Sequence, residues 1–116
     1  MTLQVFLVED DPEFGRSLVE LIRSTPLLEL AGWSDSIVQA KSDISTTNAD
    51  VYLVDLGLPD GSGQTIIELL AHTRPHARVM VLSTLGDPKH ILTSLERGAH
   101  GYLLKSDPPE HILQSI

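Results

Sequence analysis

Four positions at the ends of short apolar runs carry residue types that could do chemistry together. The run VYLV leads into Asp55, LQVFLV leads into Glu9 and Asp10, RVMVLS closes on Ser83, and GYLL leads into Lys105. Carboxylates bind hard cations or act as nucleophiles, a hydroxyl donates a hydrogen bond, and an ammonium group offsets negative charge. If the ends of these runs meet in space, the set is typical of a phosphoryl-transfer site.

The apolar runs have the composition of buried β-strands, and segments with helical spacing separate them. The runs are LQVFLV (3–8), LLELAGW (27–33), VYLV (51–54), RVMVLS (78–83) and GYLL (101–104). In the first segment between runs, Phe14, Leu18 and Ile22 share one helical face. Strands that alternate with helices over short connections indicate βαβ units. We therefore predict an α/β fold with a flavodoxin-like, doubly wound sheet of five parallel strands in the order 2-1-3-4-5, and five helices.

Helix boundaries are marked by three Asp-Pro pairs and one glycine. Asp11, Asp87 and Asp107 each precede a proline a few residues after a run, so we expect them to be N-caps, with the proline at the first helical position. Gly98 is expected to be the left-handed C-cap of the fourth helix. The last helix is expected to run from about residue 108 to residue 116.

In an open parallel sheet, functional side chains gather at the carboxyl ends of the strands, near the point where the strand order reverses. The predicted order makes the four strands that end in an acid, a hydroxyl or an amine contiguous. Lys105 follows a strand two places from the centre, and its long side chain suits that distance. Glu9, Asp10 and Asp55 would repel one another and raise a pKa unless a cation lay between them. Carboxylates, waters and a backbone carbonyl suit Mg²⁺.

The motifs LVEDDP, VDLGLPDGSG, VLST and GAHGYLLK, in this order and spacing, resemble the receiver domain of two-component response regulators. The segments LGLPDGSG and GYLLK are especially similar to those of receivers that are joined to helix-turn-helix (LuxR-type) transcription outputs. The resemblance covers residues 1–116 as one receiver domain, so an output domain is expected to lie outside this sequence. It implies a phosphorelay in which Asp55 accepts a phosphoryl group from a sensor histidine kinase or a His-containing phosphotransfer protein.

The resemblance also implies a role for each of the other motif residues at the metal site. Asp10 and Asp55 match ligands of Mg²⁺ (or Mn²⁺), and Gly57 matches the position whose backbone carbonyl completes the site. Glu9 stands where aspartate is commoner, so its longer side chain is expected to reach the metal through water. Lys105 matches the amine of the motif. The next residue, Ser106, stands where many receivers have proline, often after a cis peptide bond, so whether the Lys105–Ser106 bond is cis stays open.

Signalling is implied by two further positions. Ser83 matches the hydroxyl that contacts the phosphoryl group and moves on activation. It lies 22 positions before Lys105, which is the spacing of the family and favours Ser83 over Thr84. Tyr102 matches the aromatic switch residue. Phosphorylation is then expected to change the surface of helix 4, strand 5 and helix 5, which would control transcription and could form a homodimer.

Other interpretations stay open at this point. Asp55 could simply open a turn, Glu9 and Asp10 could be solvated acids before a helix, and Tyr102 is a good strand residue in any case. A small phosphohydrolase of the haloacid-dehalogenase kind uses similar groups, but it wants a second Asp two residues after the nucleophile, where this chain has Gly57. A receiver-like interaction module that is never phosphorylated usually lacks part of the acid, hydroxyl and amine set.

Composition limits the classes of protein to which this chain could belong. The chain has 116 residues, of which 41% are hydrophobic and 21% charged, enough for one domain with a core. Its net charge of −8, from 16 acidic and 8 basic residues, argues against direct nucleic-acid binding. There is no cysteine, no signal-peptide pattern and no apolar run near the roughly 20 residues of a membrane span. We expect a cytoplasmic protein that is not a multi-turnover enzyme and catalyses only its own phosphorylation and dephosphorylation.

Overall fold

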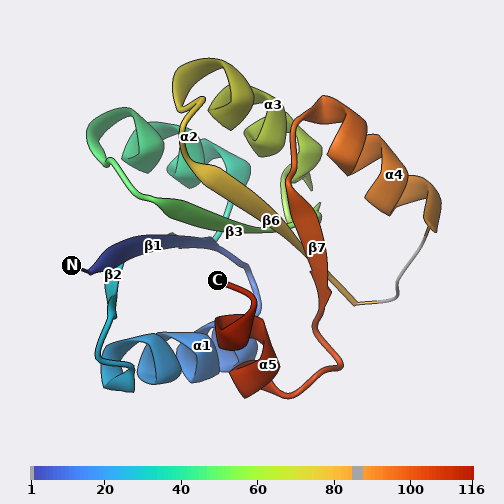
Figure 1. Cartoon of the computed structure of the whole chain (residues 1–116). Coiled ribbons are helices and arrows are strands. Elements are labelled where there is room, and N and C mark those ends of the chain that lie inside the picture. Colours follow the sequence, from blue (N-terminus) through green and yellow to red (C-terminus); the bar gives the residue numbers. More distant parts are fainter. Residues whose placement is uncertain (1, 85–87) are drawn as a thin grey trace.

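A parallel sheet forms the centre of the computed structural model, which describes residues 2–84 and 88–116 (Figure 1). Its strands are β1 (Leu3–Val8), β2 (Leu28–Ser34), β3 (Val51–Asp55), β6 (Arg78–Ser83) and β7 (Gly101–Leu104). The order is β2-β1-β3-β6-β7, with every neighbouring pair parallel. Because β4 and β5 belong to a separate small hairpin, this is the predicted order 2-1-3-4-5, and that prediction is confirmed.

Helices cover both faces of the sheet, as the apolar strands require. They are α1 (Pro12–Ser24), α2 (Ile37–Thr46), α3 (Gln64–Thr73), α4 (Pro88–Arg97) and α5 (Pro109–Gln114). In Figure 1, α2, α3 and α4 lie on one side of the sheet, and α1 and α5 lie on the other. Across the described ranges, no helix combines the length and the apolar character that crossing a membrane requires.

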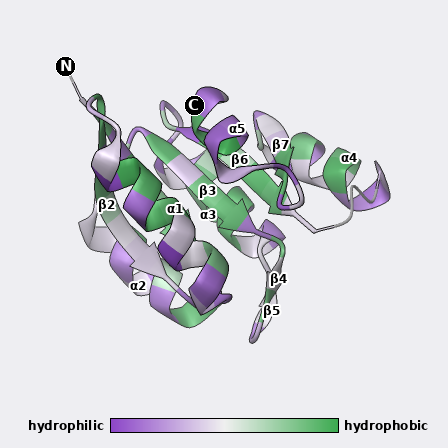
Figure 2. Cartoon of the chain, turned by 90° about the horizontal axis from the view of Figure 1, so that it is seen from below, coloured by the Kyte–Doolittle hydropathy of each residue, from purple (hydrophilic) through white to green (hydrophobic). Residues whose placement is uncertain are grey.

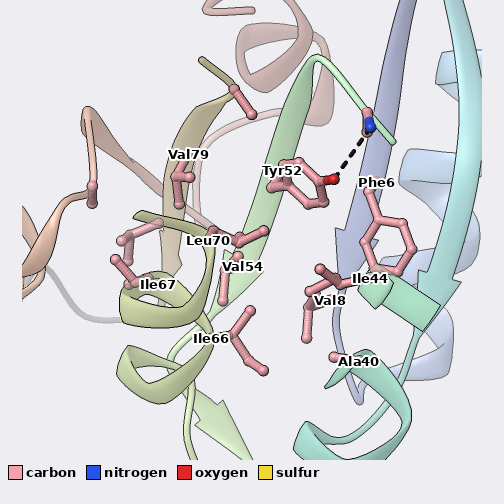
Figure 3. Close-up of a cluster of buried hydrophobic side chains, with 14 of the residues drawn as sticks. Phe6, Val8, Ala40, Ile44, Tyr52, Val54, Ile66, Ile67, Leu70 and Val79 are labelled. Atoms are coloured by element: carbon pink, nitrogen blue, oxygen red, sulfur yellow. Dashed lines mark hydrogen bonds between the residues drawn. The ribbon is translucent and has the colours of Figure 1, made fainter. Parts of the chain in front are cut away.

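Alternation along the strands builds two hydrophobic cores. Phe6 and Val8 of β1 face α2 and α3 together with Tyr52 and Val54 of β3 (Figure 3), while the intervening residues, such as Leu7, face α1 and α5. In Figure 2 the ribbons of β3 and β6 are mostly green, whereas α1 carries green and purple segments, as expected for an amphipathic helix. All five residues of β3 are buried, so this strand is held rigidly between two cores.

Two of the predicted helix caps are confirmed by hydrogen bonds. The Asp11 carboxylate accepts bonds from the backbone N–H groups of Glu13 (3.0 Å) and Phe14 (3.3 Å) at the start of α1. Gly98 has a φ of 126°, and Ala99 N–H donates to a carbonyl in the last turn of α4, which gives a glycine-terminated end of the expected kind. The predicted cap Asp87 lies outside the described residues.

The predicted N-cap Asp107 is wrong. Helix α5 begins at Pro109, with Pro108 at the N-cap position in an extended conformation (φ −55°, ψ 138°), and Asp107 is not the cap. The reason is that Pro109 disfavours helical backbone at the residue before it. The helix also ends at Gln114 rather than at residue 116, because the last backbone N–H groups bond three residues back and tighten the final turn.

A short hairpin between β3 and α3 was not predicted beyond a turn. Strands β4 (Gly57–Leu58) and β5 (Gly61–Ser62) pair antiparallel, and Asp60 lies between them. The Asp60 carboxylate accepts hydrogen bonds from the N–H groups of Ile37 (2.8 Å) and Val38 (3.0 Å), the first two residues of α2. These two bonds lower the pKa of Asp60 below its ordinary value of 3.8. The hairpin therefore supplies part of the N-terminal cap of a helix distant in sequence.

We predict that Asp60→Ala lowers the free energy of unfolding near neutral pH. Because the folded pKa of Asp60 is depressed, its contribution is fully present above 3.8 and disappears as the pH falls through the folded value. Chemical denaturation of Asp60→Ala and wild type, from neutral pH to below 3.8, should show a difference in the free energy of unfolding that shrinks in acid. The exposed Asp107 provides the control, Asp107→Ala, for which we expect little change; a stability gap for Asp60→Ala that is constant with pH would contradict the cap.

Candidate functional site

The central strand fixes one carboxylate at the edge of the sheet. Asp55 is the last residue of β3, pairs with Leu82 of β6 and is only 4% exposed. Its Oδ1 accepts a hydrogen bond from the backbone N–H of Gly57 at 3.2 Å, and its Oδ2 accepts one from Lys105 Nζ at 3.1 Å. The four apolar residues before it are packed on both faces of the sheet, so the carboxylate is held in place by the core and by two donors.

The loop after β1 brings two more carboxylates to the same point. Glu9 is fully buried, and its Oε2 accepts a hydrogen bond from the Asp11 N–H at 3.1 Å. Asp10 is exposed at the rim. Glu9, Asp10 and Asp55 each offer a carboxylate oxygen, and the three oxygens lie within 4.8 Å of one another. This all-oxygen set fits a hard divalent cation.

Lys105 supplies the positive charge between the two buried carboxylates. Its Nζ lies 2.5 Å from Glu9 Oε1 and 3.1 Å from Asp55 Oδ2, and it also lies 5.0 Å from the centroid of the Phe14 ring. Burial opposes the charge on Lys105, but the carboxylates of Glu9 and Asp55 outweigh burial and raise its pKa. Lys105 is therefore charged at neutral pH.

One ammonium is too little charge for this cluster. The pKa of Glu9 is raised from 4.5 to about 7. Burial is the largest cause and the neighbouring Asp55 carboxylate adds to it, against the opposite effects of Lys105 and the Asp11 N–H. In the protein without a metal ion, the Glu9 carboxyl group therefore titrates near neutral pH. The site has spare negative charge that a cation would offset.

A shallow pocket of about 370 Å³ opens over this cluster. It is lined by Asp10, Asp55, Leu56, Gly57, Leu82, Ser83, Thr84, His90 and Lys105. Five of the seven residues predicted for the site therefore line one pocket, and Glu9 joins them through its contacts with Lys105. The seventh, Tyr102, lies on β7 with 47% of its surface exposed and does not line the pocket.

Sequence reasoning missed three neighbours of the cluster. His90 lines the pocket from the first turn of α4, Phe14 packs beside Lys105, and Trp33 donates a hydrogen bond to the Glu9 carbonyl. A polar residue in the first turn of a helix that follows a functional strand end often faces the site. This pattern in the sequence would have indicated His90. The sequence pattern places Phe14 on the apolar face of the first helix and does not indicate its contact with Lys105. The bond between Lys105 and Ser106 is trans, as are the other peptide bonds in the described part of the chain.

Comparison with known proteins agrees with this geometry. A model of the response regulator receiver domain family matches residues 5–116. The chain belongs to this family. The receiver is 31% identical over 103 residues to the DNA-binding transcriptional activator DevR/DosR of Mycobacterium tuberculosis, covering 89% of the chain and 48% of that protein. It is 28% identical over 112 residues to the nitrate/nitrite response regulator NarL of Escherichia coli, covering 97% of the chain and 52% of NarL.

A solved structure shows the same fold. The receiver superimposes on a LuxR-family two-component response regulator from Aurantimonas sp. with a TM-score of 0.89 at 24% identity, over 98% of this chain and 81% of that one. The chain spans about half the length of the curated relatives it matches. The predicted resemblance to LuxR-type receivers is confirmed, and the family match sets the haloacid-dehalogenase alternative aside.

We predict that Asp55→Asn lowers the pKa of Glu9 from about 7 toward 4.5, because part of the shift comes from the Asp55 carboxylate. The measurement is a pH titration of the Glu9 carboxyl carbon by ¹³C NMR in the presence of a chelator. Asp50→Asn is the matched control, since Asp50 precedes the opposite end of β3. An unchanged Glu9 pKa in Asp55→Asn would show that the two carboxylates are not coupled.

Proposed function

We propose that Asp55 accepts a phosphoryl group from a phosphohistidine on a sensor histidine kinase or a His-containing phosphotransfer protein. The observation that carries this proposal is the buried Asp55 carboxylate, which lies under an open pocket with Lys105 Nζ at 3.1 Å. A carboxylate oxygen of Asp55 forms the new bond to phosphorus as the phosphorus–nitrogen bond breaks, and the imidazole nitrogen keeps the electron pair.

The residues around Asp55 have distinct parts in this transfer. Lys105 is already charged and held between the carboxylates, so it offsets negative charge on the incoming phosphoryl group without rearrangement. The Ser83 hydroxyl, at the end of the adjacent strand, donates a hydrogen bond to a phosphoryl oxygen. The Gly57 N–H continues to hold Asp55 from the other side.

We assign a Mg²⁺ (or Mn²⁺) site to Asp10, Asp55 and the backbone carbonyl of Gly57, with Glu9 acting through water. The close carboxylate oxygens support the set, and the engagement of Glu9 with Lys105 and Asp11 supports an indirect role for this residue. When bound, the ion supplies charge compensation for the carboxylates and the phosphoryl oxygens.

The proposed signal runs from Ser83 to Tyr102. Tyr102 pairs with Val81 on the adjacent strand, and Ser83 lies two residues further along on the same face. Movement of Ser83 toward the phosphoryl group leaves space into which the exposed Tyr102 ring turns. Leu92 and Leu95 of α4 are 57% and 39% exposed, so the surface of α4, β7 and α5 presents apolar groups that this movement would rearrange.

The proposed output is transcriptional control through a domain beyond this sequence. DevR/DosR is a DNA-binding activator, and the acidic receiver itself is not suited to bind DNA. The surface of α4, β7 and α5 would contact that output or a second receiver in a homodimer. The exchange with the kinase would take place in the cytoplasm, and each Asp55 carries one phosphoryl group until it is hydrolysed, so the receiver is not a multi-turnover enzyme.

We predict that acetyl phosphate with Mg²⁺ adds a single phosphoryl group to the wild type, as measured by intact mass. Asp55→Asn should show no adduct, because an amide is not a comparable nucleophile, and chelation of Mg²⁺ should abolish the adduct in the wild type. Asp50→Asn, a change of the same kind remote from the pocket, should be phosphorylated normally. An adduct on Asp55→Asn, or no adduct on the wild type in the presence of Mg²⁺, would refute the proposed function.

A further inference from the structure

Trp33 is the single tryptophan of the chain and touches the acidic loop directly. It is the second-to-last residue of β2, and its indole Nε1 donates a hydrogen bond to the backbone carbonyl of Glu9 at 2.9 Å. The ring packs against the backbone of α1 at Gly15, where an added Cβ would overlap it. The indole is therefore anchored on a helix while its nitrogen holds the loop between β1 and α1.

Hydrogen bonds to two consecutive residues of β2, Trp33 and Ser34, fix both backbone groups of Glu9. Its N–H donates to the Ser34 carbonyl at 2.9 Å, and its C=O accepts from Trp33. The Glu9 carbonyl and the Asp10 N–H belong to one planar peptide group, so holding the carbonyl also sets the direction in which Asp10 leaves the loop. Trp33 and Asp10 border the same surface pocket, on the β2 side of the site.

We propose that Trp33 is a positioning residue for the divalent-cation site: its indole N–H holds the Glu9–Asp10 peptide so that the Asp10 carboxylate meets that of Asp55. The inference rests on the proposed function, since it concerns the same metal site. Trp33 touches neither the cation nor the phosphoryl group in this account. It raises the fraction of molecules in which the loop is ready to bind.

The size of the effect follows from the strength of one hydrogen bond. A net intramolecular hydrogen bond of ordinary strength shifts an equilibrium by about 2- to 12-fold. The apparent affinity of a ligand falls with the fraction of protein that is competent to bind it. Loss of the indole N–H should therefore weaken cation binding by up to about this factor.

The test compares Trp33→Phe with Tyr52→Phe. Trp33→Phe keeps an aromatic ring against α1 and removes the donor. Tyr52→Phe removes the hydroxyl that accepts the Ala49 N–H at 3.2 Å (Figure 3), a buried aromatic-to-backbone bond at the opposite edge of the sheet. Mn²⁺ is the probe, and free Mn²⁺ is counted by electron paramagnetic resonance, with thermal melts to show that each variant is folded.

We expect a dissociation constant about 2- to 12-fold higher for Trp33→Phe and unchanged for Tyr52→Phe. Equal Mn²⁺ binding by folded Trp33→Phe and wild type would overturn the role of Trp33 and leave the proposed function intact. Absence of Mn²⁺ binding in the wild type would overturn the metal site itself, and with it both proposals.

The wild type offers a second measurement that needs no variant. Coupling between two equilibria is reciprocal, so a tether that favours the cation must itself be favoured by the cation. Saturating Mg²⁺ should therefore slow solvent exchange of the Trp33 indole N–H, as followed by NMR. The expected factor is the ratio of the Mn²⁺ dissociation constants of Trp33→Phe and wild type. Exchange that is unchanged or faster with Mg²⁺ would contradict the proposal.

Discussion

Two buried carboxylates share one ammonium at the edge of the sheet, and the rest of the structure serves that arrangement. Glu9 and Asp55 both contact Lys105, and Asp10 adds a third acid at the rim. Burial, together with the neighbouring Asp55 carboxylate, raises the pKa of Glu9 to about 7, and the ammonium of Lys105 alone leaves the cluster negative. Such a site is costly to the fold but is prepared for chemistry, because a cation and a phosphoryl group together complete its charge balance.

The fold keeps these charges together by placing them at the carboxyl ends of three strands, β1, β3 and β7. Strand β3 is buried on both faces and cannot shift, and its neighbours β1 and β6 bring the acidic loop and Ser83 to the same edge. Hydrogen bonds then fix the connecting segments: Asp11 caps α1, and Asp60 ties the hairpin after β3 to α2. The strand ends therefore remain in place although mutual repulsion would drive the carboxylates apart.

The sequence was sufficient to predict what depends on local pattern. The limits of β1, β6 and β7 match the apolar runs, and the strand order follows from alternating strands and helices. Strand β2 starts one residue later than its run, because Leu28 N–H closes a turn onto Thr25. Asp107 was a wrong cap because a second proline follows the first. The bonds from Asp60 to α2 and from Trp33 to Glu9 join segments more than 20 residues apart, and no local spacing encodes them.

The central claim is that one ammonium undercompensates the carboxylates and that a cation completes the site. The most direct measurement is the free energy of unfolding as Mg²⁺ is added, for the wild type and for Asp10→Asn. We expect the wild type to gain stability along a one-site binding curve, about 2.7 kcal/mol at a hundredfold excess over the dissociation constant, and Asp10→Asn to gain much less. An equal gain in both proteins, or none in the wild type, would contradict the account.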